Sequence, residues 1–193
     1  MNFYSLHIPY EIDIDEIVEY VSKSQESINA PLRELVEADS GFDVFQKFCL
    51  DQIENNHNIF VSENEKFRSF YAPIFLNLRL KTFCKSLSKK HKDTYVFLVS
   101  TVYEDEIQFL LYKNGREIAQ IKFDDVSEIG KSVNVEEFAD LFNVSADDIE
   151  KALVESDCIF RVLEKLGKMF DLHLDWEDTD AKKNGATKII CKW

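Results

Sequence analysis

The amino-acid sequence predicts an α+β protein in which an antiparallel β-meander sheet packs against several α-helices. Between residues 95 and 123, three segments rich in β-branched and aromatic residues follow one another with short turns. On both sides of them, hydrophobic residues recur at the spacing of amphipathic helices. The 193 residues, 45% of them hydrophobic, can bury a substantial core. We expect a single domain, helical over about 1–92, with a sheet of about four to six strands and further helices over about 93–193.

The N-terminal part is predicted to begin with a strand over 3–8. From residue 13 or 15 onward the hydrophobic residues follow helical spacing, which predicts a first helix. Pro31 suits the first turn of a second helix over 31–38, because proline at that position loses no helical hydrogen bond. A third helix is predicted over 42–54, after the Ser40-Gly41 break.

The middle of the chain contains the strongest predicted helix. Residues 59–61 are predicted to form a short strand, and 66–71 fit either a loop or a helix. A helix over 73–92 follows, with its hydrophobic residues on one face and lysines on another. Between residues 79 and 92 there are six Lys or Arg and no acid.

Three predicted strands, 95–103, 107–112 and 117–123, form the meander. The turn before the last of them contains Asn114-Gly115, the pair preferred in a two-residue type I′ hairpin because both residues tolerate positive φ. The remaining predictions are helices over 135–142, 146–155 and 158–171, N-caps at Asn134 and Ser145, and a strand in the tail 186–193.

The charge balance favours a basic protein partner over nucleic acid or membrane. The chain has 23 basic and 36 acidic residues, a net charge of −13. Such a charge repels phosphate backbones and anionic lipid and therefore disfavours non-specific nucleic-acid binding. No segment has the length and hydrophobicity of a membrane span or the pattern of a secretory signal, and we expect a cytoplasmic protein. The four cysteines, Cys49, Cys84, Cys158 and Cys191, lack zinc-site spacing and are expected to be reduced core thiols.

Enzyme motifs are scarce. The five glycines do not form a nucleotide-binding loop, no pair of histidines has zinc-protease spacing, and we expect no cofactor. An enzyme using Cys158 with His173, or a carboxylate pair assembled by the fold, is one alternative, because catalytic partners can be distant in sequence. A second alternative is a nucleic-acid adaptor that uses the basic helix face over 79–92.

Acidic and aromatic side chains are the predicted contact surface. The unit over 135–153 has the pattern of a helix-turn-helix, but its second helix is too acidic to face DNA. The polar loop over 175–180 does not match a calcium-binding loop. Aromatic residues are enriched at interfaces, and Tyr103, Tyr112, Trp176 and Trp193 are candidate exposed anchors. The predicted binding residues are Asp147, Asp148, Glu150, Asp175, Trp176, Glu177, Asp178 and Asp180.

The order of elements in the second half also carries a resemblance. A hairpin containing Leu111-Tyr112-Lys113-Asn114-Gly115-Arg116, two short acidic helices over 135–153 and a third helix over 160–172 follow one another. Over about residues 95–175 the chain resembles a set of small uncharacterised bacterial proteins, some of which are similar to immunity proteins of toxin systems. The resemblance implies a non-enzymatic inhibitor that covers a basic toxin or another basic protein.

Overall fold

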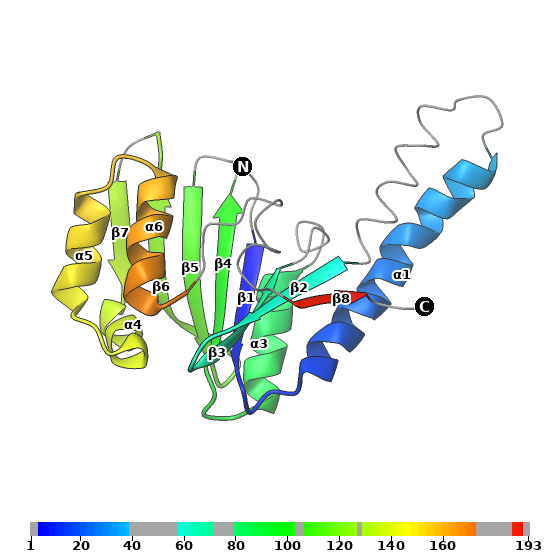
Figure 1. The fold of residues 1–193 in the computed structure, drawn as a ribbon, viewed down its shortest axis with the longest axis horizontal. Coiled ribbons are helices and arrows are strands. Elements are labelled where there is room, and N and C mark those ends of the chain that lie inside the picture. The colour runs from blue at the N-terminus through cyan, green and yellow to red at the C-terminus, as the bar shows by residue number, and fades with distance from the viewer. Residues whose placement is uncertain are drawn as a thin grey trace.

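The computed structural model describes residues 4–38, 58–71, 79–102, 106–126, 129–172 and 187–190, and it has the α+β fold predicted from the sequence. Its strands form one antiparallel sheet in the order β7-β6-β5-β4-β1-β3-β2-β8 (Figure 1). The strands are β1 (Tyr4–Pro9), β2 (Asn58–Glu63), β3 (Phe67–Tyr71), β4 (Val96–Val102), β5 (Glu106–Lys113), β6 (Arg116–Asp124), β7 (Ile129–Val133) and β8 (Thr187–Ile190). The helices are α1 (Ile14–Ala38), α3 (Leu80–Lys90), α4 (Val135–Phe142), α5 (Ala146–Val154) and α6 (Ile159–Phe170).

The eight-stranded sheet is larger than expected. The segment 66–71, expected to be a loop or helix, contains β3, which pairs with both β1 and β2. Four of its five residues are buried, so it lacks the alternation by which a half-exposed strand is recognised. The strand β7 was also missed, because Gly130, Lys131 and Ser132 give it little β-propensity.

The prediction that Pro31 begins a new helix was wrong, because α1 runs through it without a break. Proline inside a helix removes one backbone hydrogen bond and crowds the preceding turn, and α1 continues past Pro31 nonetheless. The buried residues Ile17, Val21, Gln25 and Asn29 lie four apart on one face of α1 and hold this helix against the protein. The predicted helix over 42–54 lies outside the described residues.

The turn and helix predictions of the second half are largely confirmed. Asn114 and Gly115 have φ values of 51° and 76°, as a type I′ turn requires. The helices α4, α5 and α6 lie within two residues of the predicted bounds. Asn134 and Ser145 do precede α4 and α5, but neither side chain makes a capping hydrogen bond. Asn134 Nδ2 instead donates to the carbonyl oxygen of Ile118, at 2.6 Å.

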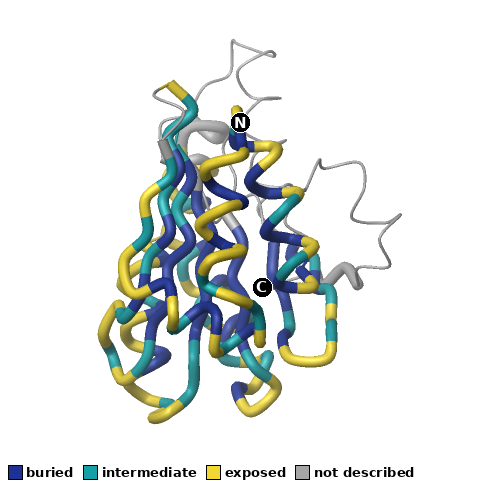
Figure 2. Tube along the Cα trace, turned by 90° about the vertical axis from the view of Figure 1, so that its left-hand side faces the viewer, coloured by how far each residue is buried: buried dark blue, intermediate teal, exposed yellow. Residues whose placement is uncertain are grey.

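The sheet separates two hydrophobic clusters. On one side, α1 and α3 pack against the strand side chains that face them and form one cluster. On the other side, α4, α5 and α6 pack against the opposite face of the sheet and form the second cluster. Figure 2 shows buried positions along the strands and exposed positions on the outer helix turns.

Tyr112, predicted to be an exposed anchor, is fully buried because it lies on β5 in the cluster that α3 covers. Burial raises the pKa of its hydroxyl and that of the buried Cys84 thiol. The other candidate anchors, Tyr103, Trp176 and Trp193, lie outside the described residues. Of the predicted exposed aromatics, the one that the structure describes is therefore a core residue.

Gly130 permits the close approach of α5 to β7. A Cβ atom at this position would lie 2.5 Å from Leu153 Cβ, well inside van der Waals contact. We expect Gly130→Ala to lower the free energy of unfolding by about 2 kcal/mol, because helix and strand must move apart. Urea denaturation measures this change. Lys131→Ala, at the exposed neighbouring position, is the control and should stay within about 0.5 kcal/mol of the wild type. Equal stabilities of the two variants would contradict the packing.

Candidate protein-binding groove

A groove of about 400 Å³ lies where β1, the β2–β3 turn, the segment before β4 and the end of α4 meet. We call it the tyrosine groove, because Tyr10 and Tyr95 both line it. It combines aromatic, acidic and aliphatic side chains from four segments that are far apart in the sequence. The lining residues are Pro9, Tyr10, Glu11, Glu65, Lys66, Phe67, Asp93, Thr94, Tyr95 and Leu141.

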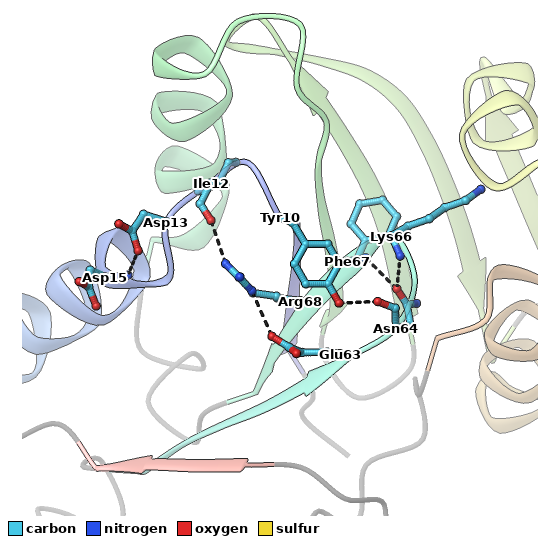
Figure 3. A network of polar contacts seen from close by, with 9 residues as sticks. All are labelled: Tyr10, Ile12, Asp13, Asp15, Glu63, Asn64, Lys66, Phe67 and Arg68. Carbon is cyan, nitrogen blue, oxygen red and sulfur yellow. Dashed lines mark hydrogen bonds and ion pairs between the residues drawn. The ribbon is translucent and has the colours of Figure 1, made fainter.

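Two contacts hold the Tyr10 side chain in place, one to its hydroxyl and one over its ring (Figure 3). Its hydroxyl donates to the carbonyl oxygen of Asn64, at 2.5 Å. The Arg68 guanidinium lies over its ring, 4.8 Å from the centroid, and Arg68 Nε is 3.1 Å from Glu63 Oε1. Tyr10 remains 39% exposed, so one aromatic surface in the groove is positioned in advance and accessible to solvent.

The β2–β3 turn is tied to the ends of two helices. Asn64 Oδ1 accepts hydrogen bonds from the backbone N–H groups of Lys66 and Phe67, at 2.9 and 2.7 Å, which fixes the turn. Asn64 Nδ2 donates to the carbonyl oxygen of Asp171, just beyond α6, and Lys66 Nζ donates to that of Leu141 in the last turn of α4. Helix C-terminal ends are partially negative, and the Lys66 ammonium partly offsets this charge at α4.

Tyr95 also interacts with a cation. Lys113 Nζ lies 4.3 Å from the centroid of the Tyr95 ring and 3.2 Å from its hydroxyl oxygen. The hydrogen bond to Tyr95 raises the pKa of Lys113. Beside it, Asp93 adopts a left-handed conformation with φ of 65°, and its backbone N–H donates to Asn114 Oδ1 at 3.2 Å.

Three carboxylates stand at this groove without an ion pair. Glu11, Glu65 and Asp93 are exposed, and none of them forms an ion pair with a residue in the described ranges. The one lysine that lines the groove, Lys66, is directed to the end of α4. The groove therefore has a negative rim beside aromatic surface, an arrangement suited to a lysine or arginine side chain.

The predicted binding residues of α5 lie elsewhere. Asp147, Asp148 and Glu150 are exposed on this helix, and Glu150 accepts a 3.3 Å hydrogen bond from Ser132. Asp148 lines a second hollow, of about 680 Å³, between α5 and α6, which also contains three lysines and is therefore mixed in charge. The other predicted residues, Asp175, Trp176, Glu177, Asp178 and Asp180, lie outside the described ranges.

The two hollows adjoin each other through a smaller one of about 140 Å³. This smaller hollow shares Glu65 and Lys66 with the tyrosine groove and Met169 with the hollow between α5 and α6. The three together form a continuous series around the C-terminal ends of α4 and α6.

The described residues offer little for the enzyme alternative. Cys158 is half-buried at the N-cap position of α6, and its proposed partner His173 lies outside the described ranges. His7 lies 2.8 Å from Ser5 Oγ and 2.7 Å from Ser69 Oγ, but all three side chains are buried, so no substrate reaches them. Burial lowers the pKa of His7 to about 3, which makes it a weak base at neutral pH.

Neither a metal site nor a membrane span emerges from the described part of the chain. No group of three or more His, Cys, Asp or Glu side chains there is placed to hold a metal ion. Nor does any helix in these ranges combine the length and hydrophobicity needed to cross a bilayer.

No residue of the tyrosine groove was predicted as a binding residue from the sequence. Its acids and tyrosines come from four separate segments and form no local motif, so spacing along the chain could not identify them. One local signal was present, the asparagine at position 64 before a short strand, which is typical of a tight turn.

Comparison of the chain with models of protein families, with curated proteins and with solved structures gives no match.

Proposed function

We propose that this protein is a non-enzymatic, cytoplasmic protein-binding module, an immunity-type inhibitor that covers a basic partner. Its main contact would be the tyrosine groove, which receives a lysine or arginine side chain of the partner. The bound module then sterically blocks the functional surface of the partner. The resemblance of residues 95–175 to proteins similar to toxin-system immunity proteins supports the class of partner.

One observation supports this proposal most directly. Both tyrosines of the groove already interact with cations of this chain, Arg68 and Lys113, while three neighbouring carboxylates form no ion pair with the described residues. Carboxylates bind cations strongly, so these three leave capacity for a further positive group beside the tyrosines. The net charge of −13 adds a long-range attraction that speeds encounter with a basic protein.

The test uses the basic protein encoded beside this one, because immunity proteins are commonly encoded next to their toxins. Binding is measured by calorimetry at about 50 and about 300 mM NaCl, and we expect a clear loss of affinity at the higher salt concentration. The variant Glu65→Gln/Asp93→Asn should bind roughly tenfold more weakly, since it removes two unpaired charges from the groove.

The matched control is Asp147→Asn/Asp148→Asn, which makes the same change in net charge on α5. We expect this variant to bind within about threefold of the wild type. If it loses affinity and the groove variant does not, the partner docks on α5 and the groove assignment is wrong. Binding that is insensitive to salt would contradict the proposed charge complementarity as a whole.

A further inference from the structure

Lysines from three elements gather on the side of the sheet opposite α4, α5 and α6. Three of them, Lys81, Lys85 and Lys89, follow one another at four-residue spacing on the exposed side of α3. The other two, Lys122 of β6 and Lys131 of β7, are directly paired in the antiparallel register. We call these five residues the lysine face.

The register and one hydrogen bond place all five on the same side. Lys122 pairs with Gln108 of β5, and Gln108 Oε1 accepts a 2.7 Å hydrogen bond from Lys81 Nζ. Residues that are opposite each other on neighbouring strands point to the same face of a sheet, so Lys122 and Lys131 lie on the side of α3. At the other end of the row, Lys89 packs against Gly115 in the β5–β6 turn.

The sheet beside this lysine row is open. α3 packs against β4 and β5 and reaches β6, whereas the helix that packs against β7 is α5, on the other side. Lys131 is exposed and Val133, at the end of β7, is 57% exposed. The amide of Gln120 lies on the same face, because it pairs with Val133. Among the described residues, accessible positions of β7 therefore adjoin the cationic row.

The lysine face is more basic than the chain as a whole, although the acidic helix α1 lies on the same side of the sheet and its Glu16 pairs with Lys90 of α3. Lys122 pairs with Glu106, but Lys85, Lys89 and Lys131 have no ion-pair partner within the described residues. The register places three carboxylates, Glu106, Glu117 and Asp124, on the same side of β5 and β6, against five lysines. The acidic helices α4 and α5 lie on the other side of the sheet, where Glu150 of α5 accepts a hydrogen bond from Ser132 of β7.

We propose that the lysine face binds a single strand of nucleic acid through its phosphates. Residues four apart on a helix rise by about 6 Å, so the row offers regularly spaced cations to a linear polyanion. A single strand has half the linear charge density of a duplex and is repelled less by a chain of net charge −13.

The chemistry around the row predicts how selective this binding is. The amide of Gln108 is already engaged, since its oxygen accepts from Lys81 and its nitrogen donates to Glu106, so it is not offered to base edges. The exposed aromatic residues of the described ranges, Tyr10 and Phe160, lie away from the lysine face, so bases have no exposed ring to stack on there. Binding therefore rests on phosphate contacts and is insensitive to sequence.

The test is fluorescence anisotropy with a labelled oligodeoxythymidine of about 20 nucleotides. We expect binding at about 50 mM NaCl and a loss of affinity of roughly 20- to 100-fold at about 200 mM, as about three to five phosphate contacts predict. Lys85→Glu/Lys131→Glu should weaken binding at least about tenfold. The matched control, Lys151→Glu/Lys168→Glu, makes the same change in net charge on α5 and α6 and should bind within about twofold of the wild type. Circular dichroism verifies that each variant is folded.

Three results would overturn the assignment. The first is no anisotropy change for the wild type at the lower salt concentration. The second is an equal loss of affinity in both double variants, which would show that net charge alone decides binding. The third is displacement of the oligonucleotide by a polyglutamate of similar length at lower concentration than by unlabelled oligonucleotide, which would identify an acidic polypeptide as the ligand.

Discussion

Replacement of Phe97 by alanine is expected to lower the free energy of unfolding by about 4 kcal/mol, a large share of the stability of an ordinary domain. Phe97 is fully buried on β4, and its ring lies between 5.0 and 6.3 Å, centroid to centroid, from five other rings. Its neighbours come from β1, β5, α4 and α6, namely His7, Phe109, Phe138, Phe142 and Phe170. Truncation leaves a cavity that no single element can fill, and buried Phe→Ala changes cost about 3–5 kcal/mol.

The matched control for this variant is Phe160→Ala. Phe160 lies in the first turn of α6 and is 54% exposed, so the same chemical change should cost about 0.5 kcal/mol. Chemical denaturation monitored by circular dichroism measures both. Similar losses for the two variants would mean that Phe97 is not at the centre of the core.

The second large effect is a loss of stability in acid that depends on His7. This residue of β1 is fully buried between β3 and β4, with its ring stacked on Phe97 at 5.0 Å and its nitrogens near two serines. Burial lowers its pKa from 6.5 to about 3, since the charged imidazolium would lose its hydration. Between these two values the unfolded chain binds a proton that the folded chain does not. The contribution of His7 to the free energy of unfolding therefore falls as the pH decreases from about 6.5 to about 3.

The size of this effect is measurable at about pH 4.5, where the folded protein still holds His7 neutral. About two pH units below the unfolded pKa, the loss relative to neutral pH is about 3 kcal/mol. Urea denaturation at these two pH values measures it in the wild type and in His7→Gln, whose amide can still hydrogen-bond to the serines. Carboxylate titration is common to both proteins, so we expect the wild type to lose about 3 kcal/mol more than the variant. An equal loss would show that His7 is not held neutral.

Local features of the fold were predictable where neighbouring residues determine them. The Asn114-Gly115 turn follows from the tolerance of both residues for positive φ, and the amphipathic spacing over 135–170 located three helices. The largely buried strand β3 was not predictable, because a short aromatic segment with four of its five residues buried has no clear alternation. The break expected at Pro31 was wrong, since α1 continues past the proline, and the described buried residues of this helix all precede it.

The candidate site was less predictable than the fold. Tyr10 and Tyr95 come to one groove because β1 pairs with both β3 and β4, and the partners of β1 lie more than about 50 residues away along the chain. Composition indicated acidic and aromatic side chains as the contact surface. The acidic residues predicted on α5, however, do not line the groove. Composition states how many charges a chain has and contains no information on which of them become neighbours.

The sequence by itself determined the α+β class, the hairpin, the helices after it and the net charge of −13, since these depend on spacing of a few residues or on simple counts. The tertiary structure alone decided the strand order, and with it which charged side chains lie on the same side of the sheet. Strand pairing joins distant segments, and it places Lys122 and Lys131 beside α3 while α4 and α5 lie on the opposite side. The reason is physical: each strand turns alternate side chains to opposite faces, and only the register across the sheet fixes which charges meet.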